Sequence, residues 1–135
     1  MPIRFDLDPR SGFVRSALSG PVSAADISDH CRALRKANAH SRPAFIDVRQ
    51  MDGDFSMGDL LAIAASAARE FAGEEVQPCA IVVGERRQFE WARILACLVA
   101  GWVSVGAFTD PREAEAWLRH GTETTAVAVA RARLA

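Results

Sequence analysis

Alternating hydrophobic and polar residues at the start of the sequence predict a β-hairpin. Ile3, Phe5 and Leu7 alternate with polar residues, which is the period of a half-buried strand. A turn-forming segment at residues 8–12, rich in Asp, Pro, Ser and Gly, separates them from a second run at 13–19. We interpret the two runs as antiparallel strands joined by that turn.

Four segments with helical spacing follow, separated by short apolar runs. Ser23 and Ser56 each stand three positions before an acidic residue, the spacing of a helix N-cap. Gly84 and Pro111 mark the starts of two further helices. The apolar runs between the helices are interpreted as strands, at residues 44–48, 79–83 and 102–108.

The order of these elements is β-β-α-β-α-β-α-β-α. A hairpin followed by alternating units predicts an α/β fold with a mixed, mostly parallel sheet of about five strands and about four helices. No linker or internal repeat divides the chain, so residues 1–121 are expected to form one domain. Residues 122–135 have no clear period and are expected to form a C-terminal tail or an added element.

Composition narrows the function classes. Lys+Arg 16 against Asp+Glu 17 leaves a formal net charge of −1, so the chain has no basic footprint for nucleic acid or an anionic membrane. The longest uncharged run, residues 94–109, is shorter than the ~20 residues that a spanning helix needs. The start carries no signal-peptide pattern, and three widely spaced cysteines fit a reducing compartment. A cytoplasmic protein without a transmembrane segment is expected.

Residue types that bind metals or act as nucleophiles lack the spacing for either chemistry. The histidines do not pair at helical spacing with each other or with cysteine, and are expected at the surface: His30, His40 and His120. The cysteines fall on apolar stripes and are expected in the core: Cys31, Cys79 and Cys97. We therefore predict no metal site, no cofactor and no catalysis.

Acid–base catalysis is the weaker alternative. Asp52, Asp54 and Asp59 form a local acidic cluster, with Glu74 and Glu75 at the other end of the same helix, and paired carboxylates can divide the acid and base roles. No positioned His or Lys accompanies the cluster in the sequence, and acidic residues before a helix are also favoured by the helix dipole. The cluster therefore gives the enzyme hypothesis only weak support.

Two loops that follow predicted strands are the candidate binding surface. The first is glycine-flanked and leads into a helix N-terminus, whose free N–H groups suit an anion; its candidate residues are Asp52, Gly53, Asp54, Ser56 and Gly58. The second places two arginines at a helix start, against the dipole preference; its candidate residues are Gly84, Arg86 and Arg87. Phe89 is expected on the buried, apolar side of the third helix. Trp91 lies two residues further on, so we expect its side chain to be only partly covered and to act as an apolar anchor for a partner.

Five short segments carry a combined pattern: FDLDP with GFV in 5–14, LSGPVS at 18–23, FIDVR at 45–49, AIVVG at 80–84 and VGAFTD at 105–110. Their order and spacing resemble the STAS (anti-anti-sigma-factor-like) superfamily, in its SpoIIAA-like, STAS/SEC14-like bacterial branch. The resemblance covers residues 3 to about 120. It implies a compact SpoIIAA-like α/β domain that binds a protein or a ligand.

In the anti-anti-sigma members, a D-S-[S/T]-G motif at the start of the second helix carries a regulatory phosphoserine. The matching stretch here has Phe55 in place of the Asp, and Met57 falls at or next to the phosphorylated position. Ser56 is therefore the candidate phosphosite that the resemblance implies. Other branches resemble binders of lipids or hydrophobic ligands.

We predict a non-enzymatic, regulatory binding module for a protein partner or a small anionic ligand, with the two loops as its working face. The alternative is a carrier of a small apolar ligand or lipid. Its pocket would lie between the third helix and the sheet, lined by Ile94, Leu95, Leu98 and Trp102. A homodimer is compatible with a small domain of this kind, but no particular residue indicates one.

Overall fold

The computed structural model describes residues 2–120, so the expected tail or added element at 122–135 lies outside the described residues. Within that span the elements follow in the order β1 (Ile3–Leu7), β2 (Val14–Pro21), α1 (Ala24–Lys36), η1 (Ala39–Ser41), β3 (Ala44–Asp52), α2 (Met57–Phe71), β4 (Cys79–Val82), α3 (Arg86–Leu98), β5 (Val105–Phe108) and α4 (Pro111–His120). The five strands and four α-helices match the predicted order. The last strand begins three residues later than the apolar run at 102–108 indicated.

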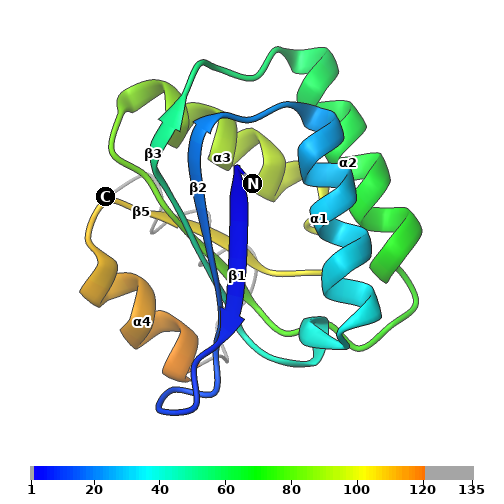
Figure 1. The fold of residues 1–135 in the computed structure, drawn as a ribbon, viewed down its shortest axis with the longest axis vertical. Helices are drawn as coiled ribbons and strands as arrows, with labels where there is room; N and C mark the ends of the chain where they lie inside the picture. Colours follow the sequence, from blue (N-terminus) through cyan, green and yellow to red (C-terminus); the bar gives the residue numbers. More distant parts are fainter. Residues whose placement is uncertain (1, 121–135) are drawn as a thin grey trace.

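The strands form one sheet in the order β1-β2-β3-β4-β5. β1 pairs antiparallel with β2, and the remaining neighbours are parallel. Helices α1, α2 and α3 cover one face of the sheet, whereas α4 covers the other (Figure 1). The carboxyl ends of β3 and β4, where the candidate loops begin, are therefore at the same edge of the sheet.

Side-chain caps start the first two helices where the sequence predicts them. Ser23 accepts a hydrogen bond from the Asp26 N–H, and the Asp26 carboxylate accepts one from the Ser23 N–H. Ser56 and Asp59 form the same reciprocal pair. Such caps satisfy N–H groups that have no partner within the helix, and losing one costs about 1 kcal/mol.

Two core clusters lie on opposite faces of the sheet. The larger lies under α1, α2 and α3 and includes Leu18, Val48, Ile63, Ile81 and Trp91. The smaller lies under α4 and comprises Phe13, Phe45, Ala80, Val82, Phe108, Ala114, Trp117 and Leu118. β4 therefore contributes side chains to both clusters, which explains its uninterrupted apolar sequence.

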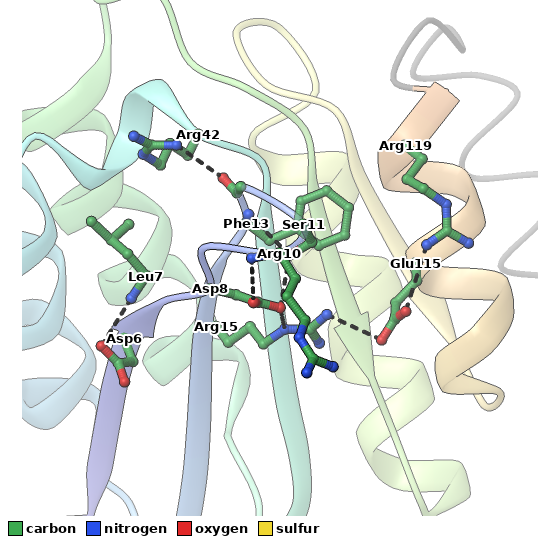
Figure 2. A network of polar contacts seen from close by, with 11 residues as sticks. Asp6, Leu7, Asp8, Arg10, Ser11, Phe13, Arg15, Arg42, Glu115 and Arg119 are labelled. Carbon is green, nitrogen blue, oxygen red and sulfur yellow. Dashed lines mark hydrogen bonds and ion pairs between the residues drawn. The ribbon is translucent and has the colours of Figure 1, made fainter.

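A polar network fixes the turn between β1 and β2 against α4 (Figure 2). Arg15 donates to the Asp8 carboxylate at 2.9 Å and to Glu115 at 3.2 Å, and its guanidinium lies 4.7 Å from the centre of the Phe45 ring. The hydrogen bond from Arg15, with one from the Arg10 N–H, lowers the pKa of Asp8 to about 2. The network joins segments about a hundred residues apart and holds α4 on its face of the sheet.

Three side chains differ from the expected burial. His30 is half-buried rather than at the surface, and its Nε2 lies 3.0 Å from Ser16 Oγ. The His40 side chain is only 8% exposed and packs against Phe71. Cys97, expected in the core, is exposed because it lies one residue beyond Ala96, on a different side of α3 from the buried face.

No helix among residues 2–120 has the length and apolar character needed to cross a bilayer.

We expect Gly106→Ala to destabilise the fold by about 1–3 kcal/mol, because an added methyl group would overpack the core. A Cβ at Gly106 would lie 2.8 Å from Phe108 Cε2. Gly101→Ala is the matched control, since a Cβ there meets nothing within 4 Å, and should change stability by less than about 0.5 kcal/mol. Urea denaturation measures both; equal losses would contradict the packing described for β5.

The burial of His30 predicts acid sensitivity. Burial lowers the pKa of His30 from 6.5 to about 4, so the unfolded chain binds a proton between these pH values and the folded chain resists it. The contribution of His30 to the free energy of unfolding is therefore fully present above pH 6.5, and up to about 3 kcal/mol of it is lost as the pH drops to about 4. Denaturation midpoints against pH should lose this slope in His30→Gln and keep it in His120→Gln. An unchanged slope in His30→Gln would contradict the assignment.

Candidate functional site

The structure brings the two candidate loops together. We call residues 52–58 and 84–87 the crest. Arg87 Nη1 lies 3.8 Å from Asp54 Oδ2, and the Phe55 ring meets the Trp91 ring edge-on with centroids 5.0 Å apart. The parallel pairing of β3 and β4 produces this proximity, because it delivers both loops to one edge of the sheet.

Several crest amides are already hydrogen-bonded within the chain. The N–H groups of Gly84 and Glu85 donate to Gln88 Oε1 at 2.8 and 3.3 Å. The Ser56 hydroxyl accepts from the Asp59 N–H, and the Ser56 N–H donates to the Asp59 carboxylate. An anion at these particular N–H groups would have to displace the internal bonds.

The crest arginines stand among carboxylates. The Arg86 and Arg87 side chains are 91% and 68% exposed. Arg86 pairs with Glu90 at 3.3 Å, and Arg87 pairs with Asp54. Exposed pairs of this kind are worth about 0–1 kcal/mol, so both guanidinium groups stay accessible to a partner. The surrounding carboxylates, however, reduce the preference of the crest for a small anion.

Trp91 is not the partly covered anchor that the sequence predicts. It is 5% exposed and lies beneath the crest against Phe55. The buried face of α3 includes Gln88 and Trp91, which the spacing of Phe89 with later alanines does not reveal. Gln88 is 1% exposed, and its Nε2 donates to the Val48 carbonyl oxygen at 2.9 Å. This bond, together with those to the crest amides, fixes the rotation of the helix.

An apolar cavity of about 170 Å³ lies between the sheet and α1, α2 and α3. Its wall presents no polar surface. The lining side chains include Leu34, Ile46, Ile63, Ala67, Ile81 and Leu95. The pocket predicted as the alternative is therefore present in part: Leu95 and Trp102 line it, whereas Ile94 and Leu98 do not. It reaches beyond α3 because α1, α2 and the loop before β4 contribute to its wall.

Small residues leave the space unfilled. Five of the lining residues have short side chains: Cys31, Ala39, Ala44, Ala67 and Cys79. Burial raises the pKa of the Cys31 thiol to about 11 and that of Cys79 to about 12, so both remain uncharged at neutral pH. The cysteines thus behave as small apolar groups in the wall.

The contact between Ser16 and His30 is the arrangement that comes nearest to a nucleophile–base pair. Its geometry permits proton transfer, since the ring nitrogen and the hydroxyl oxygen are 3.0 Å apart. Ser16 is only 3% exposed, however, and does not line the cavity. No carboxylate within residues 2–120 forms an ion pair with His30 to orient it. The contact is therefore a structural hydrogen bond between β2 and α1.

Within the same described span, no three His, Cys, Asp or Glu side chains gather closely enough to hold a metal ion.

No model of a known protein family matches the chain, and no curated protein matches it. Among solved structures, it is similar to an uncharacterised protein of the DUF3478 family with a SpoIIAA-like fold from Shewanella loihica PV-4. The superposition has a TM-score of 0.58 at 22% sequence identity and covers 86% of this chain and 91% of the other. Together with the observed strand order, this similarity confirms the predicted architecture: the chain has a SpoIIAA-like fold.

Proposed function

We propose that this chain binds a small molecule whose apolar part fills the cavity beneath α1, α2 and α3. The observation that carries the proposal is an apolar space of about 170 Å³ whose wall presents no polar surface. In a well-studied lysozyme variant, an engineered apolar cavity of roughly 150 Å³ stays dry and binds benzene or xenon. The space in this chain has the size and wall chemistry for a comparable guest.

Side chains that border an apolar space lack packing partners on that side. A guest that fills the space would restore the missing van der Waals contacts without displacing a polar group.

The volume also limits the ligand. Drug-sized molecules occupy pockets of about 300–1,000 Å³, so the cavity holds a single ring or a short chain and not an entire membrane lipid. This favours the small apolar ligand over the lipid in the predicted alternative.

The cavity adjoins the surface at the edge of the sheet opposite the crest. Four of its lining residues also line a shallow surface depression: Val76, Gln77, Trp102 and Val103. Val76 and Gln77 precede β4, and Trp102 and Val103 precede β5. A route through this depression would leave the crest undisturbed.

Filling the cavity with a side chain should abolish ligand binding. We expect benzene to raise the melting temperature of the wild-type chain. At a free benzene concentration of ten times its Kd, the free energy of unfolding should increase by ~1.4 kcal/mol. Ala67→Met places extra atoms in the cavity and should remove this rise, whereas Ala62→Met, on the exposed side of the same helix, should keep it. Calorimetric melts with and without benzene measure both. No rise in the wild type, or an equal rise in Ala67→Met, would overturn the proposal.

A second candidate function is recognition of a protein at the crest. Met57 and Leu61, one turn apart at the start of α2, are 54% and 53% exposed and supply apolar surface next to Ser56. Arg86 and Arg87 supply exposed cationic groups at the start of α3. Ser56, the candidate phosphosite that the STAS resemblance implies, is exposed, and a phosphate on it would add a charge of about −1.5 to −2 at the start of α2. This combination supports a protein partner better than a small anion, because exposed apolar groups lie beside the arginines and the arginines already stand next to carboxylates.

The crest proposal predicts a partner that depends on its arginines. Proteins retained from a native-host extract by the wild-type chain should include one that is lost when Arg86→Glu and Arg87→Glu are combined. Arg119→Glu, on the exposed side of α4, is the matched control and should retain it. Identical retained proteins with all three baits would contradict a role for the crest.

A further inference from the structure

We propose that the ligand of the cavity is a small amphipathic carboxylate, with its apolar body inside the cavity and its carboxylate bound by Arg42. This inference rests on the proposed cavity function. It adds the chemical class of the ligand and a residue that selects it.

Arg42 is the only Lys, Arg, Asp or Glu residue in the described lining of the cavity. Because the wall presents no polar surface, the aliphatic part of Arg42 forms wall and its guanidinium lies outside the apolar space. The residue is exposed and stands between η1 and β3. A single side chain therefore contributes apolar surface to the cavity and a cation at its boundary.

The Arg42 guanidinium has no carboxylate partner among residues 2–120. Its one hydrogen bond is long, at 3.5 Å from Nη1 to the Gly12 carbonyl oxygen, in the turn between β1 and β2 (Figure 2). Arg15 and Arg35, by contrast, pair with carboxylates at 2.9 and 3.0 Å. Arg42 thus retains donors for an external carboxylate, which a guanidinium can bind with two parallel hydrogen bonds.

Two carboxylates, Glu70 and Glu74, lie near the cavity but outside its described lining. Glu74 contacts the lining residue His40 at 3.6 Å, but Arg35 also binds it, at 3.0 Å. The described lining itself contains no Asp or Glu. A ligand carboxylate therefore meets an unpaired cation and no acidic side chain in the wall.

The volume of the cavity limits the size of the apolar part of the ligand. A space slightly larger than one that accepts benzene suits a six-carbon chain or one aromatic ring. The ligand class is therefore short-chain or aryl carboxylates. A longer acyl chain would exceed the space, and a free phosphate or sulfate would leave it unfilled.

The test measures binding of hexanoate and hexanol, which share one apolar chain and differ in the head group. Isothermal titration at pH 7.5 and low salt gives the ratio of their Kd values for four chains: wild type, Arg42→Gln, Ala67→Met and Arg119→Gln. We expect the wild type and Arg119→Gln to prefer hexanoate by about three- to tenfold. Arg42→Gln should lose that preference and keep its affinity for hexanol, whereas Ala67→Met should bind neither probe.

The outcomes separate the two proposals. Equal preference for hexanoate in wild type and Arg42→Gln, or a wild type that prefers hexanol, overturns the role of Arg42 and leaves the cavity function standing. Failure of the wild type to bind either probe overturns both. Thermal melts of the four free chains check that each variant is folded at the temperature of the titration.

Discussion

Three helices pack onto one face of the sheet, and this packing shapes both the cavity and the crest. Several of the side chains that line the space between these helices and the sheet are short, among them Cys31, Ala67 and Cys79. Large groups such as Phe71 and Trp91 form other parts of the same wall. The short side chains leave an apolar space in a domain interior, where voids are normally few.

The same layer accounts for the crest. Trp91 forms part of the cavity wall and also supports Phe55, so the crest loops rest on the upper wall of the cavity. Gln88 ties the loop before α3 to the middle of β3 through three hydrogen bonds. Part of the polar character of the crest is thus used inside the fold, whereas Arg86 and Arg87 remain exposed.

Much of the architecture follows from local patterns in the sequence. The capping pairs of Ser23 and Ser56 and the apolar run of β4 predict their elements, and parallel pairing predicts that the two loops meet. The phase of α3 could not be predicted, because a buried Gln88 breaks the apolar pattern and its partner, the Val48 carbonyl, lies 40 residues away. The extent of the cavity could not be predicted from the sequence either. Its volume depends on which side chains face one another across elements, and an alanine such as Ala67 fits a filled core as well as an empty one.

A crystal structure of the chain under xenon pressure would show whether the apolar space between the sheet and the helices exists. Xenon binds apolar cavities by dispersion alone, so it reports the space independently of any biological ligand. We expect xenon between the sheet and α2, in contact with Ile63, Ala67 and Ile81, with the fold unchanged. A structure in which these side chains close on one another and exclude xenon would contradict this expectation.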